Sequence, residues 1–107
     1  MRKLALESDK DVFLMAFAPW CGHCKDALPQ WKQLAEELKI QENFVVAEID
    51  ATVNTMPEEF PVRGYPTIFW IGADSGGVPV KYDGDRKVGA WRRFVKQQRQ
   101  LRMRKEL

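Results

Sequence analysis

The first half of the chain contains two apolar segments separated by a periodic one. Residues 12–18 form a continuous apolar run that ends at Pro19, and residues 44–50 are again rich in β-branched and aromatic side chains. Segments of this length and content predict buried strands. Between them, apolar residues recur at intervals of three and four over 25–39, which predicts an amphipathic helix. A strand, a helix and a second strand in this order indicate a crossover unit whose strands pair in parallel.

Two short strand-like segments and one helix-like segment follow in the second half. Residues 67–71 and 78–82 are largely β-branched or aromatic, and the glycine-rich sequence between them predicts a hairpin with a long loop. Pro79 lacks a backbone N–H, so we expect the last strand at an edge of the sheet. After it, the apolar spacing predicts a helix over about 89–104, with one apolar and one basic side.

The composition is that of one globular domain. The chain has 107 residues, 45% of them hydrophobic and 30% charged, and residues 1–107 show no linker or internal repeat. A chain of this length can bury a single core without additional cross-links. No apolar run approaches the length of about 20 residues that a bilayer requires, and the N-terminal residues lack the apolar region of an export signal. We therefore expect one domain that neither spans a membrane nor carries its own export signal.

Positive charge is concentrated near the C-terminus. The formal net charge is only +2, but residues 91–107 hold seven basic side chains and one acidic side chain. A basic segment can bind nucleic acid or another acidic surface. Nucleic-acid binding is disfavoured because no aromatic stacking platform accompanies these charges. We interpret the basic residues as the solvent-facing side of a helix.

Both cysteines belong to one motif, Trp20-Cys21-Gly22-His23-Cys24, which directly follows the first predicted strand. Cys21 falls at the mouth of the following helix, where unpaired backbone N–H groups stabilise an anion and a protonated His23 would add positive charge. The thiol pKa of Cys21 should therefore fall below its ordinary value of about 8.5, which makes the thiolate a ready nucleophile. Cys24 lies one helical turn further on the same side and can attack a mixed disulfide to release the partner. The motif predicts thiol–disulfide exchange.

Other uses of such a cysteine pair fit less well. A structural zinc ion normally has four ligands, whereas this chain offers two cysteines and one histidine. Attachment of a c-type haem needs histidine directly after the second cysteine, where Lys25 stands. A purely structural disulfide that closes so short a loop would add little stability. We therefore expect no metal and no bound cofactor, and a redox-active Cys21–Cys24 disulfide instead.

Four segments resemble the protein disulfide isomerase family, whose catalytic domains are thioredoxin-like. These segments are APWCGHCK at 18–25, IDAT at 49–52, VRGYPT at 62–67 and YDGDR at 82–86. The resemblance covers roughly residues 12–100 and is greatest to the last catalytic domain of a multidomain isomerase. It implies an α/β thioredoxin-like fold with a mixed central sheet flanked by helices. Because only 20 residues precede Cys21, the first strand of the family is either absent or outside this chain.

The resemblance also implies roles for residues away from the cysteines. Pro66 corresponds to the cis-proline of the family, which faces the cysteine pair and presents backbone groups of Tyr65 to an extended substrate. The alternative is a trans proline that starts a strand. Trp20 and Tyr65 would form an apolar rim for unfolded chains, unless they are simply packed. Arg86 corresponds to a mobile arginine that approaches the second cysteine and lowers its pKa, and the alternative is a solvated loop arginine.

One position departs from the family pattern. The strand before the motif reads MAFAPWCGHC, so Met15 replaces the glutamate that serves the family as a buried proton acceptor for the second cysteine. On the neighbouring predicted strand, Glu48 stands where the family has lysine. We hypothesise that Glu48 supplies the carboxylate beneath Cys24, with burial raising its pKa toward neutrality. The alternative is a glutamate at an edge or on the surface.

These features favour an enzyme that forms, reduces or isomerises disulfides in unfolded or partly folded cysteine-containing proteins. Stabilising the thiolate also stabilises the reduced form, so the pair should be a comparatively strong oxidant. Glutathione or a disulfide-donating oxidase would be its redox partner. Gly22 and His23 between the cysteines disfavour the alternative of a thioredoxin-like general reductase, whose usual pair is Gly-Pro. A peptide-binding chaperone module that does not need the cysteines is a third interpretation.

The C-terminal tetrapeptide bears on the compartment. Arg104-Lys105-Glu106-Leu107 agrees with the retention sequence Lys-Asp-Glu-Leu at its last two positions. If this is a signal, the natural protein resides in the lumen of the endoplasmic reticulum and its signal peptide lies outside this chain. Chance similarity is the alternative.

Overall fold

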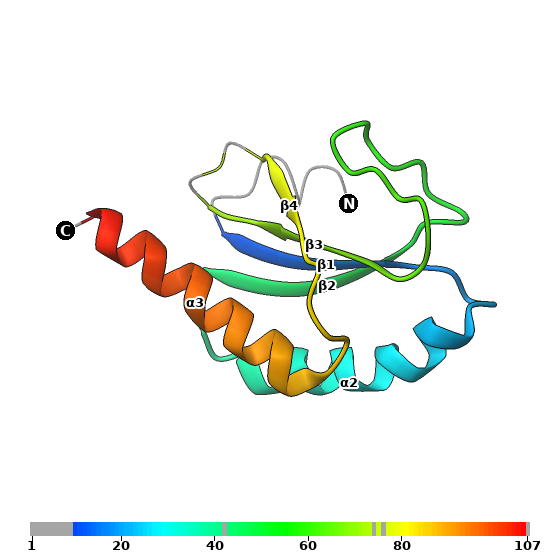
Figure 1. Cartoon of the computed structure of the whole chain (residues 1–107), viewed down its shortest axis with the longest axis horizontal. Coiled ribbons are helices and arrows are strands. Elements are labelled where there is room, and N and C mark those ends of the chain that lie inside the picture. The colour runs from blue at the N-terminus through cyan, green and yellow to red at the C-terminus, as the bar shows by residue number, and fades with distance from the viewer. Residues whose placement is uncertain (1–9, 42, 74, 76, 107) are drawn as a thin grey trace.

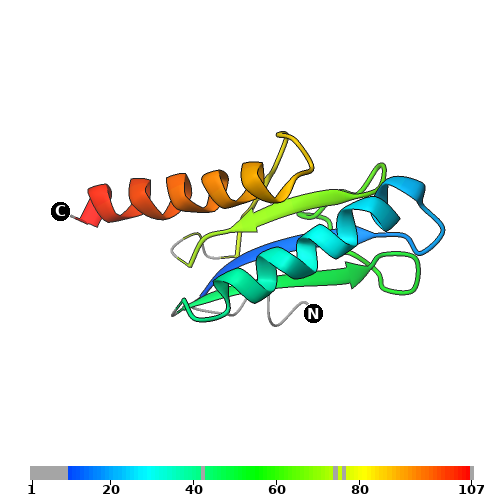
Figure 2. The same ribbon diagram turned by 90° about the horizontal axis from the view of Figure 1, so that it is seen from below.

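The computed structural model describes residues 10–41, 43–73, 75 and 77–106. In this part of the chain, four strands form one mixed sheet in the order β2-β1-β3-β4. The elements in chain order are β1 Asp11–Phe17, α2 Gly22–Leu38, β2 Phe44–Asp50, β3 Thr67–Ile71, β4 Pro79–Lys81 and α3 Val88–Glu106. β1 pairs in parallel with β2 and antiparallel with β3, and β3 pairs antiparallel with β4. Figures 1 and 2 show α2 and α3 on the same face of the sheet.

The parallel β1–β2 unit, the β3–β4 hairpin and the edge position of β4 confirm the sequence predictions. Several element boundaries differ by one to three residues. α2 begins at Gly22 rather than at residue 25, because its first turn contains small and polar residues and therefore lacks the apolar periodicity. β4 covers only Pro79–Lys81 instead of 78–82. The expectation about a further N-terminal strand concerns residues 1–9, which lie outside the described residues.

The core has two layers because successive side chains of β1 point to opposite faces of the sheet. On the helix side, Phe13 and Met15 pack in one buried cluster with Trp31 of α2. On the other side, Leu14 belongs to a second cluster that includes Phe60. The segment that carries Phe60 connects β2 to β3 and covers this second face (Figure 1).

Trp31 anchors α2 to the sheet. Its ring is 1% exposed, and its centroid lies 4.7 Å from that of Phe13 and 4.9 Å from that of Trp91 in α3. The indole Nε1 donates a hydrogen bond of 2.9 Å to the carbonyl oxygen of Ala47 in β2. Truncation of so deeply buried a ring costs about 3–5 kcal/mol of stability. Trp31 thereby fixes the position of the helix whose first turn carries the cysteine pair.

Basic residues of α3 do more than face the solvent. Arg92 forms a bidentate pair with Glu37 of α2, with Nη2 lying 2.9 Å from each carboxylate oxygen. Arg99 lies 3.4 Å from the wholly buried carboxylate of Asp11 at the start of β1. The interpretation of these residues as the solvent-facing side of a helix is therefore wrong for Arg99, whereas Arg92 is exposed as expected and in addition pairs with α2.

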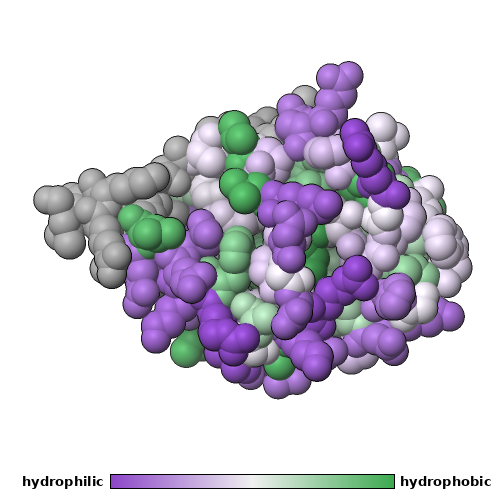
Figure 3. Space-filling model, in the orientation of Figure 1, coloured by the Kyte–Doolittle hydropathy of each residue, from purple (hydrophilic) through white to green (hydrophobic). Residues whose placement is uncertain are grey.

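On one face of the molecule, apolar side chains are scattered rather than continuous. Figure 3 shows isolated hydrophobic spots among mostly hydrophilic residues on the face that it presents. Large exposed apolar side chains among the described residues are Trp20, Ile40, Val53, Val78, Val80 and Leu101. None of the helices in the described ranges combines the length and the apolar character that crossing a bilayer needs.

Candidate active site

Cys21 occupies the N-cap position of α2, directly after the bend that follows β1. Its backbone is extended, with φ −81° and ψ 123°, and its carbonyl oxygen accepts the first helical hydrogen bond from the N–H of Lys25 at 3.1 Å. The Cys21 N–H donates to the carbonyl of Ala18 at 3.1 Å, which closes the bend. No side chain caps the N-terminus of α2, so its first N–H groups remain directed at the Cys21 sulfur.

The environment of Cys21 favours its thiolate. The S–H of Cys24 and the backbone N–H groups of Cys24 and His23 act as hydrogen-bond donors toward the Cys21 sulfur, and they hold its pKa below the ordinary value of 9.0. The positive charge of Arg86 acts in the same direction, whereas partial burial opposes it. His23 itself is exposed, and its backbone N–H is one of these donors. In the thiol form, Cys21 donates to the carbonyl oxygen of Tyr65 at 3.4 Å.

Cys24 has the opposite character. It is 0% exposed, and burial raises the pKa of its thiol to about 11, an effect that the negative charge of Cys21 reinforces. A backbone hydrogen bond from Ala18 and the charge of Arg86 offset this only in part. Both cysteines are reduced in this structure. One sulfur is therefore poised to attack while its neighbour stays protonated beneath it.

The Tyr65–Pro66 peptide bond is cis, as the resemblance implied. The loop that carries this bond faces the cysteines, because the carbonyl of Tyr65 accepts from Cys21. The hydroxyl of Thr67 donates to the carbonyl of Gly64 at 2.6 Å, which closes the loop on itself. A chain that lies along this loop would therefore pass next to the Cys21 sulfur.

Trp20 and Tyr65 lie together at the rim of the site. Their ring centroids are 5.5 Å apart in an edge-to-face arrangement, which is favourable for aromatic pairs. Trp20 is 69% exposed and Tyr65 is partly buried. The expected apolar rim is thus present, and Trp20 is not a packed core residue.

Arg86 lies in the loop between β4 and α3 and borders the same site. Its side chain is exposed, and its charge acts on both cysteines. The preceding turn needs glycine at position 84, because any side chain there would collide with the hydroxyl of Tyr82, which packs over it. Tyr82 in turn donates to the carbonyl of Asp85 at 2.7 Å. This turn presents Arg86 to the cysteine pair.

The hypothesis of a buried Glu48 is wrong. β2 is an edge strand of the described sheet, and Glu48 is exposed there, opposite Met15 of β1 in the parallel register. Met15 is 0% exposed and occupies the core beside β2. Among the described residues, the only buried carboxylate belongs to Asp11, at the far end of β1 from the cysteines. An edge strand leaves one side open to solvent, and the Glu48 side chain is exposed there.

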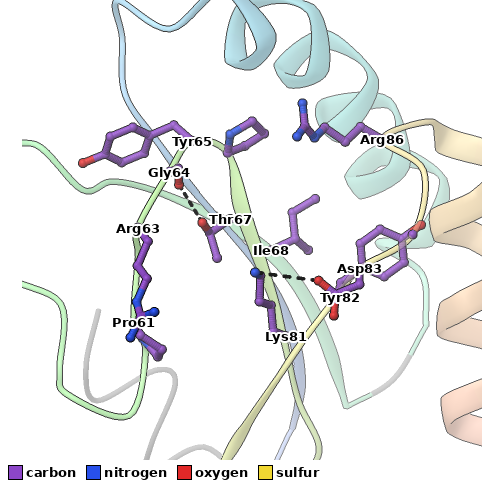
Figure 4. Close-up of a pocket in the computed structure, with 12 residues that line it drawn as sticks. Pro61, Arg63, Gly64, Tyr65, Thr67, Ile68, Lys81, Tyr82, Asp83 and Arg86 are labelled. Atoms are coloured by element: carbon purple, nitrogen blue, oxygen red, sulfur yellow. Dashed lines mark hydrogen bonds and ion pairs between the residues drawn. The ribbon is translucent and has the colours of Figure 1, made fainter.

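A pocket of about 490 Å³ lies beside the cis-proline loop (Figure 4), and the Tyr65 carbonyl of this loop accepts from Cys21. The pocket lies between the Tyr65–Pro66 loop and the segment that leads from β4 to Arg86. Two cationic lining residues, Arg63 and Lys81, were not predicted from the sequence as site residues. Arg63 belongs to the segment VRGYPT, and its closeness to Pro66 in the sequence could have indicated a place near the site. Lys81 reaches the pocket only through strand pairing.

The described residues contain no group of three or more histidine, cysteine, aspartate or glutamate side chains placed to hold a metal ion. What the arrangement does offer is a sulfur with a lowered pKa at a helix N-terminus, a buried second sulfur and a cis-proline loop. Together these features define a thiol–disulfide exchange domain.

The family follows from comparison with known proteins. The family model described as Thioredoxin matches residues 2–97, and the chain belongs to this family. The solved first thioredoxin domain of mouse protein disulfide-isomerase A4 superposes with a TM-score of 0.69 at 38% identity, covering 81% of this chain and 61% of that chain. A crystal structure of human ERp44, at 21% identity and a TM-score of 0.78, shares the fold over 91% of this chain and 30% of its own. The thioredoxin-like fold class is thus confirmed.

Curated relatives confirm the resemblance to protein disulfide isomerases. The chain is 43% identical over 90 residues to protein disulfide-isomerase A3 of Gallus gallus, which covers 84% of this chain and 18% of the relative. It is 42% identical over 94 residues to protein disulfide-isomerase 1 of Caenorhabditis elegans, covering 87% and 19%. The chain therefore spans less than a fifth of the length of these two relatives.

Proposed function

We propose that this chain is a thiol–disulfide oxidoreductase domain that forms, reduces and isomerises disulfides in folding proteins. The observation that carries this proposal is the contrast within one cysteine pair. Cys21 has a lowered pKa and lies beside the cis-proline loop, whereas Cys24 is wholly buried with its pKa raised to about 11. Such a contrast makes Cys21 the attacking sulfur and Cys24 the resolving sulfur.

In the oxidising direction, a client thiolate attacks the Cys21 sulfur of the Cys21–Cys24 disulfide. The S–S bond breaks, Cys24 leaves as a thiolate and takes up a proton, and Cys21 is now joined to the client. A second client thiolate attacks the client sulfur of this mixed disulfide, so the client gains a disulfide and Cys21 is released as a thiolate. Two electrons pass from the client to the domain, and the reduction of a client disulfide runs through the same steps in reverse.

Isomerisation uses the reduced pair. The Cys21 thiolate attacks a client disulfide, and a different client thiolate then displaces Cys21 from the mixed disulfide, with no net transfer of electrons. If no client thiolate arrives, Cys24 loses its proton and attacks the Cys21 sulfur, which releases the reduced client. The raised pKa of Cys24 delays this escape and gives the client time to rearrange.

This function implies client proteins, a redox partner and a compartment. The clients are unfolded or partly folded proteins with cysteines, and glutathione or a disulfide-donating oxidase recycles the pair. The chemistry resides in the two sulfurs and calls for no further cofactor. The similarity to protein disulfide isomerases supports the lumen of the endoplasmic reticulum as the compartment. The Thioredoxin match over residues 2–97 supports a single thioredoxin-like domain in this chain.

The test follows disulfide formation in a peptide with two cysteines, in a glutathione buffer at pH 7. The wild-type chain should accelerate the reaction, and Cys21→Ser should abolish the acceleration. Cys24→Ser should instead accumulate a mixed disulfide with the peptide, visible by mass spectrometry. Acceleration that survives in the Cys21→Ser variant would overturn the proposal.

A peptide-binding chaperone module is a second candidate, favoured by the exposure of Trp20 beside Tyr65. It predicts that suppression of client aggregation survives replacement of both cysteines by serine and is lost in Trp20→Ala. A thioredoxin-like general reductase would instead show a strongly reducing equilibrium with glutathione.

A further inference from the structure

The pocket next to the cis-proline loop is lined by an excess of positive charge. Of its lining residues, Arg63, Lys81 and Arg86 are cationic and Asp83 is the one carboxylate. The Lys81 ammonium lies 3.7 Å from Asp83, and both side chains are exposed. Within the described ranges, Arg63 and Arg86 form no hydrogen bond or ion pair, so their charges are available to a ligand.

The two cations that the redox chemistry does not use lie on one side of the loop. Arg63 precedes the Tyr65–Pro66 bend in the sequence. Lys81 lies beside the strand that follows the bend, because it pairs with Phe69 of β3. The chain doubles back at this bend, where Thr67 bonds to Gly64. Figure 4 shows both side chains below the bend, Arg63 beside Pro61 and Lys81 directed toward Asp83, whereas Arg86 lies above them.

The positions of Arg63 and Lys81 determine how many residues would separate the client cysteine from the client side chain that they meet. Arg63 is three residues before Pro66, and extended residues span at most about 3.6 Å each, so Arg63 lies no more than about 11 Å from the proline. A client that places its cysteine at Cys21 and runs along the loop would bring a residue two to four positions from that cysteine to Arg63 and Lys81. A small thiol centred on Cys21 would instead meet Arg86.

We propose that this pocket is a charge-selective client subsite, in which Arg63 and Lys81 bind an acidic side chain two to four residues from the reacting client cysteine. The inference rests on the proposed oxidoreductase function and adds to it a preference among clients. Complementary charges beside a reacting group raise the rate of productive encounter and disfavour partners of like charge. Asp83 opposes the preference because it neutralises Lys81.

The test uses short peptides with one cysteine, held as a disulfide with a reporter thiol. Glutamate, glutamine or lysine stands three positions before or after the cysteine, and the second-order rate constant for attack by the reduced chain is measured at low salt. For one of the two positions, the glutamate peptide should react about 2- to 5-fold faster than the glutamine peptide, a range typical of exposed ion pairs. The lysine peptide should be slower than both.

Charge variants assign the effect to the pocket. Arg63→Gln and Lys81→Gln should each reduce the advantage of the glutamate peptide while leaving the glutamine peptide unchanged, and Asp83→Asn should enlarge it. Lys96→Gln, a matched loss of one exposed charge on α3, should have no effect. The advantage should also shrink in 1 M salt, where the screening length falls to about 3 Å.

Each contrary result has a distinct meaning. Equal rates for the three peptides, with normal exchange of the glutamine peptide, would overturn the subsite and leave the oxidoreductase function standing. Failure of every peptide to exchange would overturn the function and the subsite with it. If Arg63→Gln slows glutathione disulfide as much as the glutamate peptide, the charge serves a small anion and the client assignment is wrong.

Discussion

Met15 and Glu48 are direct neighbours on parallel strands, yet the methionine is wholly buried and the glutamate is exposed. By the resemblance to protein disulfide isomerases, the family has a buried glutamate at the position that Met15 occupies here, and that glutamate accepts the proton of the second cysteine. In this domain the position is apolar and the adjacent carboxylate lies in solvent. Cys24, with its pKa raised to about 11, therefore has no buried carboxylate near it among the described residues.

A carboxylate restored at position 15 should accelerate resolution. We expect Met15→Glu to resolve a mixed disulfide at pH 7 at least about 10-fold faster, since a positioned general base contributes about 10²–10⁴-fold in favourable cases. The measurement is stopped-flow release of a reporter thiol from Cys21. Met15→Gln is the matched control, because it introduces a buried polar group, at a cost of about 1–3 kcal/mol, without a base. Equal rates for the two variants would contradict the explanation.

Glu48→Gln should leave resolution unchanged. The carboxylate is exposed on an edge strand, so its removal takes no base away from Cys24. The rate of mixed-disulfide resolution from pH 6 to pH 9 should superpose on that of the wild type. A flattened pH profile in the variant would show that Glu48 reaches the buried sulfur after all.

The stability of the reduced domain should pass through a maximum as pH rises. The pKa of Cys21 is lower in the folded than in the unfolded state, so its contribution is present above the unfolded value of 9.0 and is lost as pH falls through the folded value. The pKa of Cys24 is raised to about 11, so stability falls as pH rises from 9.0 toward that value. Chemical unfolding of the wild type and of Cys21→Ser/Cys24→Ser at several pH values measures both limbs. Parallel profiles for the two proteins would contradict the assignment.

Arg99 should stabilise the domain more than Arg92. Its guanidinium faces the wholly buried Asp11 carboxylate and lies over the Phe44 ring, 5.3 Å from the centroid. Arg99→Met leaves that carboxylate without this cation and should lower the free energy of unfolding by about 2–4 kcal/mol. This is less than for a fully buried pair, because Arg99 is partly exposed. Arg92→Met breaks an exposed pair with Glu37 and should cost about 0.2–1 kcal/mol. Denaturant unfolding compares the two, and equal losses would show that burial of Asp11 does not set the cost.

Local patterns predicted most of the fold. β1 was predictable because a strand buried on both faces needs a continuous apolar run. α2 was predictable because a helix buried along one side needs apolar residues at intervals of three and four. The cysteine motif likewise predicted the site, since its chemistry is local to the first turn of α2. The position of Glu48 depended on strand order, which places β2 at an edge of the described sheet. Lys81 reached the pocket through pairing with Phe69, a contact that no short segment encodes.

The most direct measurement is the pH titration of the Cys21 thiol, followed by thiolate absorbance or by its rate of alkylation. The wild type should titrate clearly below 9.0, and Cys24→Ala should titrate higher than the wild type, because the S–H of Cys24 is the largest stabilising contact of the thiolate. A wild-type midpoint at or above 9.0 would contradict the assignment of Cys21 as the attacking sulfur.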